Sequence, residues 1–193
     1  MAQAIKQWKE RVEAHHQQSL RAQGPMPPRD FWRPYASHFR ADPRRADDPV
    51  LRRLLSRVRA RETVLDVGGG AGRFALPLAL KCRQVTVVEP SEAMVQELEA
   101  GARETGITNV TAVKATWEEA QVEPGDVVLC SHVLYGVADV EPFLRKLDSH
   151  ARRLVLVLMF MESPQSHLAP FWERVHKEER VNLPGLPELL AVL

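Results

Sequence analysis

Hydrophobic residues in the middle of the chain form short, uninterrupted runs, and the segments between these runs have apolar residues at helical spacing. Apolar runs that are bounded by turn residues indicate buried strands, which form parallel sheets covered by helices on both faces. The pattern therefore predicts a doubly wound, Rossmann-like α/β fold with a mostly parallel sheet. The expected strands are 63–67, 85–88, 110–113, 126–131 and 153–160, and the expected helices between them are 73–81, 91–104 and 140–147.

Helical patterns prevail at both ends of the chain. Residues 3–22 place apolar side chains among charged ones, which predicts an amphipathic helix that ends at Gly24–Pro28. A second helix is expected from Pro49 to Ala60, because Asp47 or Asp48 provides an N-cap immediately before a proline. The tail repeats its apolar residues at helical spacing over 168–175.

These patterns divide the chain into an N-terminal helical extension or cap, residues 1–60, and an α/β domain, residues 61–193. The last expected strand is followed by a helical stripe, by proline breaks and by an apolar end at Leu190–Leu193. We therefore expect the α/β domain to be incomplete at its C-terminal side, without the strands that would close the sheet.

Charge and composition narrow the function classes. The chain has 26 basic and 25 acidic residues, so its net charge of +1 gives no general attraction to nucleic acid or to an anionic membrane. Ten arginines lie between Arg29 and Arg61 with acids such as Asp30 among them, which is typical of a solvated helical face; an anion-binding patch is the alternative.

Targeting and cysteine patterns favour the cytoplasm. Cys82 and Cys130 match neither a zinc site nor a disulfide framework, and we expect two buried free thiols and no bound metal. The first 20 residues lack the apolar core of a secretory signal. The longest apolar run, Leu154–Met161, is too short to span a bilayer.

The segment from Val64 to Gly72 carries the clearest chemistry. A strand ends in Asp66 and Val67, and Gly68, Gly69, Gly70 and Gly72 then form a turn that opens a helix. Glycines let the backbone adopt positive φ and let a ligand approach closely, and the helix N-terminus adds unpaired N–H groups. In doubly wound sheets this first turn borders the ligand site.

A second acid, Glu89, ends the next strand, 17 residues after Gly72. A carboxylate at this position can accept hydrogen bonds from both hydroxyls of a ribose. The order of strand, Asp, glycine turn, helix, strand and Glu resembles the class I S-adenosylmethionine-dependent methyltransferases, and so does the run from Asp126 to Tyr135. The resemblance covers roughly residues 60–160 and implies fold and cofactor more than substrate.

The resemblance implies roles for individual residues. Asp66 would support the glycine turn that wraps the methionine part of the cofactor, Glu89 would hold the ribose, and Pro90 follows it into the next helix. Thr116 and Trp117 would flank the adenine, although many family members have an acid there. Ser131 and His132 would lie near the sulfonium.

The methyl acceptor is expected to be a small molecule, and a homodimer stays open. We expect its pocket over the end of the strand 126–131, between the N-terminal aromatic segment and the tail, with His132, Tyr135, Tyr35 and Trp172 as candidate contacts. Two other functions are alternatives: a protein that binds the cofactor without catalysis, and an NAD(P)-dependent oxidoreductase. The latter fits poorly, because Glu89 is too close to the glycines for a dinucleotide fingerprint.

Overall fold

The structure, a computed structural model, describes residues 1–23 and 30–193. The helix end expected at Gly24–Pro28 lies outside these residues. Within the described parts, the chain forms two compact units. We call residues 30–131 and 146–157 the sheet unit, and residues 1–23, 132–145 and 158–193 the helical unit.

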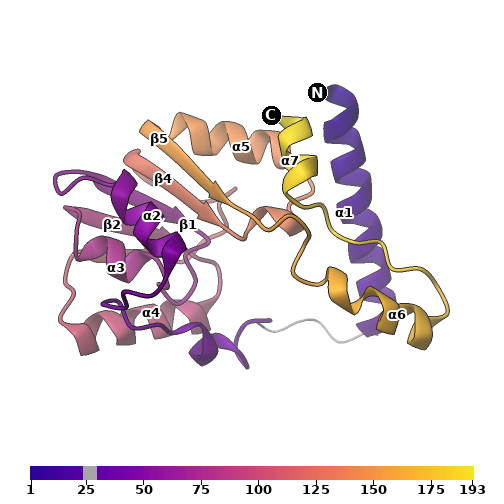
Figure 1. Cartoon of the computed structure of the whole chain (residues 1–193), viewed down its shortest axis with the longest axis horizontal. Coiled ribbons are helices and arrows are strands. Elements are labelled where there is room, and N and C mark those ends of the chain that lie inside the picture. The colour runs from indigo at the N-terminus through magenta and orange to yellow at the C-terminus, as the bar shows by residue number, and fades with distance from the viewer. Residues whose placement is uncertain (24–29) are drawn as a thin grey trace. The chain divides into compact units, whose positions relative to one another are not determined.

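The sheet unit contains a five-stranded sheet in the order β3-β2-β1-β4-β5, which confirms the predicted doubly wound, Rossmann-like fold (Figure 1). β1 is central and runs parallel to β2 and to β4, with Asp66 opposite Val87 and Leu129. The strands are β1 (Thr63–Val67), β2 (Gln84–Val88), β3 (Val110–Val113), β4 (Gly125–Ser131) and β5 (Ala151–Leu158). Each of the five follows the predicted bounds within two residues.

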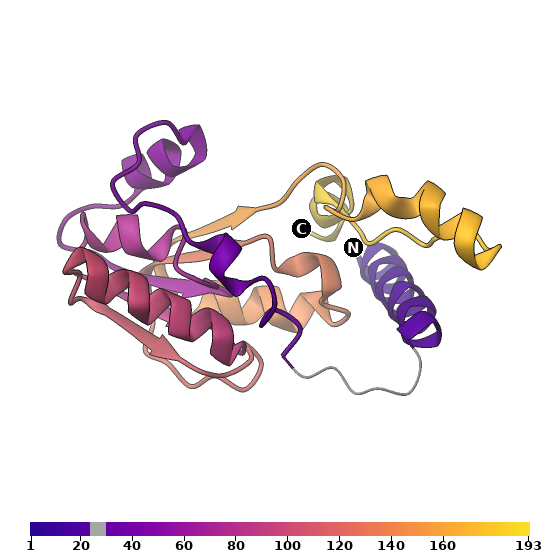
Figure 2. The same ribbon diagram turned by 90° about the horizontal axis from the view of Figure 1, so that it is seen from below.

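Helices cover both faces of this sheet. On one face lie α2 (Pro49–Arg57), α3 (Ala75–Ala79) and α4 (Glu92–Thr105), as Figures 1 and 2 show. On the other face lies the last turn of α5 (Val140–Ser149), where Lys146 donates hydrogen bonds to the carbonyl oxygens of Trp117 and Ala120.

Side-chain caps set the beginnings of two helices, and the first of them is at Asp48, one of the two positions that the sequence predicts. Asp48 accepts a hydrogen bond from the Leu51 N–H at 2.9 Å, and the Ser91 hydroxyl accepts one from the Met94 N–H at 3.2 Å. α3 is shorter than its predicted range 73–81, because Arg73 and Phe74 remain in the turn that leaves the glycine loop.

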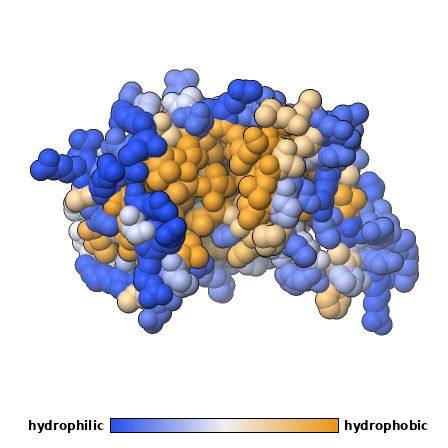
Figure 3. Space-filling view, turned by 45° about the horizontal axis from the view of Figure 1, so that its top comes forward, coloured by the Kyte–Doolittle hydropathy of each residue, from blue (hydrophilic) through white to orange (hydrophobic). Residues whose placement is uncertain are grey.

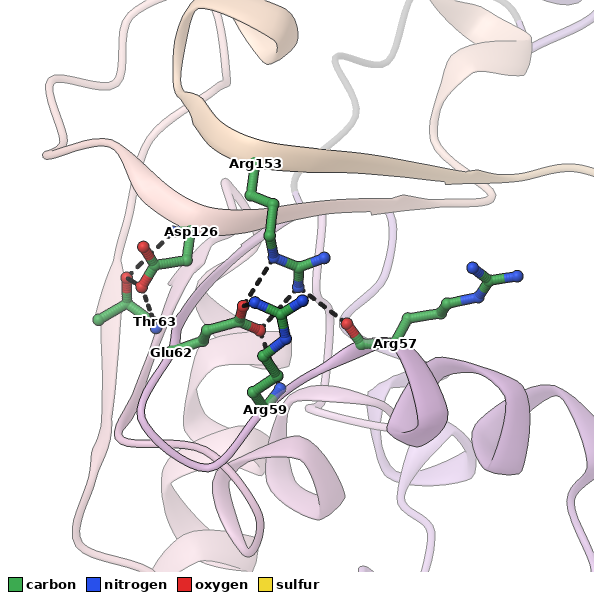
Figure 4. Close-up of polar contacts among 6 residues, drawn as sticks. All are labelled: Arg57, Arg59, Glu62, Thr63, Asp126 and Arg153. Carbon is green, nitrogen blue, oxygen red and sulfur yellow. Dashed lines mark hydrogen bonds and ion pairs between the residues drawn. The ribbon is translucent and has the colours of Figure 1, made fainter.

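Polar contacts join three strands of the sheet near their amino ends (Figure 4). Glu62 is buried and accepts two hydrogen bonds from the Arg153 guanidinium, at 2.6 and 2.7 Å. Asp126 accepts hydrogen bonds from the N–H and hydroxyl of Thr63, at 2.8 and 3.0 Å. These contacts hold β1, β4 and β5 together at the end of the sheet opposite the carboxyl ends of the strands.

β5 forms one edge of the sheet, and its aliphatic side chains are only partly covered. Residues 154–158 are all of intermediate burial. Figure 3 shows apolar side chains gathered over this strand. Five strands are all that the residues 1–23 and 30–193 contribute to the sheet.

The helical unit is built on α1 (Ala2–Gln23), α6 (Ala169–His176) and α7 (Leu186–Val192), so the predicted N-terminal and tail helices are confirmed. The Trp8 indole is buried and donates to the Val137 carbonyl at 2.7 Å. The apolar end of the chain forms α7, which packs on α1 and buries Leu189 and Val192. No helix of the described parts has the length and apolar character to cross a membrane.

Candidate functional site

The glycine turn after β1 lies at the carboxyl ends of β1 and β2. Gly68, Gly70 and Gly72 have φ values of 69°, 53° and 83°, a region that favours glycine. The Gly68 N–H donates to the Val88 carbonyl at 2.8 Å, which joins the turn to β2. A Cβ on Gly69 would lie 2.8 Å from Asp66 Oδ2. The turn therefore offers bare backbone to a ligand.

Asp66 is 1% exposed, and among the described residues nothing donates a hydrogen bond to its Oδ1 oxygen. Burial, together with the charge of Glu89, raises the pKa of Asp66 to about 7. A buried oxygen without a donor costs roughly 1–3 kcal/mol. Such an oxygen suits a ligand that brings a hydrogen-bond donor or a positive charge.

Glu89, at the end of β2, is buried and bonded to the glycine turn. Its Oε2 accepts from the Gly70 N–H at 3.0 Å, and its Oε1 accepts from the Ser91 N–H at 2.9 Å. Burial raises its pKa despite these two hydrogen bonds, and the charge of Asp30 adds to the effect. Each carboxylate oxygen retains a second acceptor position, so Glu89 can bind a pair of hydroxyls.

Asp30 belongs to this site, although the pattern of charges around it predicts a solvated helical face. Its carboxylate binds the start of α4, where it accepts from the Ser91 hydroxyl at 2.8 Å and from the Ala93 N–H at 3.1 Å. Ser91 thus contacts Glu89 through its N–H and Asp30 through its hydroxyl. No local pattern reveals this link, because Asp30 and Ser91 are 61 positions apart.

The residues after β3 are engaged in local contacts. The exposed Thr116 hydroxyl bonds to Glu119 at 3.0 Å. Trp117 is buried, with its ring 4.7 Å from the Lys146 ammonium and 5.1 Å from the His150 ring. Their predicted contact with the adenine stays a prediction.

Ser131 ends β4, and His132 follows it in a left-handed conformation with φ of 61°. Within the helical unit, His132 Nδ1 lies 3.0 Å from the Tyr135 hydroxyl, and the His132 ring packs on Phe160 with centroids 4.4 Å apart. The Tyr135 hydroxyl accepts from the Phe160 N–H at 2.7 Å, and burial raises the pKa of Tyr135. The structure therefore brings His132 and Tyr135 together, and their predicted contact with an acceptor stays a prediction.

The other two acceptor candidates lie in different units. Tyr35 is 51% exposed in the sheet unit, in an aromatic cluster with Phe31. Trp172 belongs to α6 in the helical unit, where the Arg180 guanidinium lies 3.9 Å from its ring centre. Among the described residues, the buried Trp172 Nε1 has no hydrogen-bond acceptor.

Comparison with known proteins adds to this geometry. A family model described as a methyltransferase domain matches residues 36–191. The ubiquinone biosynthesis O-methyltransferase of Rickettsia felis is 33% identical over 90 residues, which are 46% of this chain and 36% of that protein. The 23S rRNA (uracil(1939)-C(5))-methyltransferase RlmD of Pseudomonas putida is 36% identical over 104 residues, 51% of this chain and 23% of that protein.

A solved structure shares the fold. The magnesium protoporphyrin IX methyltransferase of Synechocystis, crystallised with bound S-adenosylhomocysteine, superimposes with a TM-score of 0.57 at 19% identity. The match covers 84% of this chain and 73% of that chain. The chain spans about a third of the length of the ubiquinone methyltransferases that it matches.

Proposed function

This chain belongs to the methyltransferase domain family, and we propose that it binds S-adenosylmethionine and methylates a small molecule. The observation that carries the proposal is that two buried carboxylates, Asp66 and Glu89, lie at the glycine turn. Their free acceptor positions match the groups of this cofactor: a cationic amino acid part and a ribose with two hydroxyls. We assign Glu89 to the ribose and the Asp66–Gly72 turn to the methionine part.

The cofactor supplies an activated methyl group on a positively charged sulfur. The protein then has to hold the acceptor in line with that methyl group and exclude water, and positioning of this kind accounts for much of the rate. Asp66 favours a positive charge nearby when it is ionised. Pro90, Ser131 and His132 complete the proposed cofactor contacts.

Isothermal calorimetry with S-adenosylhomocysteine tests the assignment of Glu89. Wild type should bind, and Glu89→Ala should lose roughly 1.5–3 kcal/mol, because two hydrogen bonds to a charged acceptor disappear. Equal affinity in both proteins would rule out Glu89 as the ribose ligand. Tight binding without methyl transfer to a broad panel of small acceptors would favour a non-catalytic binding protein.

The acceptor contacts that we propose are His132, Tyr135, Tyr35 and Trp172. Aromatic walls with a few polar groups suit a small, largely apolar acceptor. The changes Tyr35→Ala, Trp172→Ala and His132→Ala should lower acceptor turnover. Tyr35→Ala and Trp172→Ala should leave S-adenosylhomocysteine affinity within about 1 kcal/mol of wild type. Unchanged turnover in all three variants would contradict this assignment.

We further propose that the protein works in the reducing cytoplasm. The proposal is supported by Cys82 and Cys130, which are both buried and both free thiols. Burial raises the pKa of each thiol, so neither is poised as a nucleophile.

A further inference from the structure

Residues 30–33 form a strap that is held against the start of α4. Asp30 holds the strap: its carboxylate accepts from the Ser91 hydroxyl and the Ala93 N–H on the helix, and from the Trp32 N–H within the strap at 3.2 Å. The helix dipole stabilises a carboxylate at the N-terminus of α4. Since the same carboxylate also bonds the Trp32 N–H, it holds Trp32 beside α4.

A cavity of about 420 Å³ opens between the strap and the sheet. One side is lined by Phe31, Trp32 and Arg33, and the other by Pro90, Glu92 and Lys114. The volume falls in the range of small-ligand sites. Ser91, which also lines the cavity, donates its N–H to the proposed ribose ligand Glu89 at 2.9 Å, so the cavity adjoins the place proposed for the ribose.

We propose that this cavity receives the adenine ring of the cofactor, stacked on Trp32, and that Asp30 is a positioning residue for that ring. The inference rests on the proposed function, since it assumes the ribose at Glu89. Trp32 is 41% exposed, so part of its ring is available to a planar ligand. Trp117, by contrast, is buried against Lys146 and His150. We therefore assign to Trp32 the stacking on the adenine that the family resemblance implies for Trp117.

The rim of the cavity also fits the edge of an adenine. Adenine presents an amino donor beside a ring nitrogen acceptor. Glu92 and Lys114, 3.5 Å apart, present an acceptor beside a donor. The Glu92 carboxylate thus provides, from the first turn of α4, an acid for the adenine amino group, a position at which the stretch after β3 has Ala115, Thr116 and Trp117.

Tryptophan fluorescence of the full chain distinguishes the two candidate rings. Binding of S-adenosylhomocysteine should quench the emission of wild type and of Trp117→Phe, whereas Trp32→Phe should lose the quenching while still binding in calorimetry. Trp32→Ala should bind roughly tenfold more weakly, as expected for loss of one base–aromatic stack. Quenching that persists in Trp32→Phe and disappears in Trp117→Phe would overturn the proposal.

Asp30→Ala tests the positioning role, with Asp42→Ala as a matched control. Asp42 lies between the strap and α2, and its carboxylate accepts from the Arg44 N–H, whereas that of Asp30 accepts from the first residues of α4. Asp30→Ala should weaken S-adenosylhomocysteine about fivefold or more and shift the fluorescence response, and Asp42→Ala should do neither. Equal behaviour of the two variants would refute a positioning role for Asp30.

S-inosylhomocysteine, in which a carbonyl replaces the adenine amino group, tests the edge contact. Wild type should bind it at least tenfold more weakly than S-adenosylhomocysteine, and Glu92→Gln should narrow the gap because an amide can donate to the carbonyl. Glu99→Gln, an exposed change on the same helix, is the control. A gap that Glu92→Gln leaves unchanged would contradict the edge contact. Absence of any binding to wild type would refute the proposed function instead.

Discussion

Asp66 shows how a single residue can lower stability and favour binding. Its carboxyl is almost completely buried, and its Oδ1 has no donor among the described residues. The unfolded chain ionises this group near its ordinary pKa of 3.8, but the folded chain only near 7. Folding therefore becomes less favourable as the pH rises from about 4 to 7, and the full cost remains at higher pH.

Asp66→Asn should consequently stabilise the ligand-free protein at pH 8. The expected gain is roughly 2–4 kcal/mol, because the variant has no buried charge to form. At pH 4 the wild-type carboxyl is protonated in the folded state, and the two proteins should have similar free energies of unfolding. Denaturant unfolding at both pH values checks this, and a gain of equal size at pH 4 would show that the cause is not ionisation.

The same carboxylate should make cofactor binding depend on pH. S-adenosylmethionine is cationic and prefers the ionised form of Asp66, so its affinity should rise between pH 6 and pH 8. In Asp66→Asn the affinity should be lower at pH 8 and nearly flat over this range. Calorimetry at the two pH values measures both effects, and a flat wild-type profile would contradict this role of Asp66.

At the scale of elements, Gly72 connects the ligand loop to the packing of two helices. It has a φ of 83°, and a Cβ there would lie 2.4 Å from Leu98 Cδ1 on α4 and 3.0 Å from Leu76 Cγ on α3. Gly106 follows α4 with a φ of 69°, and apart from its chain neighbours no atom of the described residues lies within 4 Å of its hypothetical Cβ. The two glycines thus share backbone strain but differ in packing.

Gly72→Ala should therefore destabilise the protein far more than Gly106→Ala. The backbone term is roughly 1–2 kcal/mol in both variants, and Gly72→Ala adds an overpacking cost of about 1–3 kcal/mol. Urea unfolding of the two variants isolates the packing term as their difference. Equal losses would show that the space around Gly72 relaxes freely.

The sequence predicts the elements of the sheet well because their signals are local. β1 and β3 occupy the predicted ranges 63–67 and 110–113, since each apolar run is bounded by turn residues. The caps at Asp48 and Ser91 are also local signals. The tie between Asp30 and Ser91 is not, because it joins loop and helix residues that only folding brings together.

At the scale of the whole molecule, residues far apart in the chain contact one another within the helical unit. The sequence predicts one extension over residues 1–60, but residues 1–23 belong to the helical unit and residues 30–60 to the sheet unit. α1 meets the tail through the Arg180 guanidinium, which donates to His15 Nε2 at 2.8 Å and to the Ser19 hydroxyl at 2.6 Å. The Gln18 amide donates to the Glu179 carbonyl at 2.7 Å. These partners are more than 150 positions apart, so no sequence period predicts them.

Protonation of His15 should weaken the contacts between α1 and the tail. A guanidinium only donates, so His15 Nε2 must accept from Arg180, and the proton on Nδ1 is donated to the Val181 carbonyl at 2.6 Å. Burial and the Arg180 charge, with His16 nearby, hold the pKa of His15 below its usual 6.5.

The neutral form is thus favoured in the folded state. The contribution of His15 to stability is complete above pH 6.5 and is lost as the pH falls through its lower, folded-state pKa. The protection factors of residues 178–182, which correct for the slower intrinsic exchange at low pH, should fall between pH 7 and pH 5. His15→Gln can bond Val181 or Arg180 but cannot gain a proton, so its protection should not change with pH. Equal acid sensitivity in that variant would assign the effect to another group.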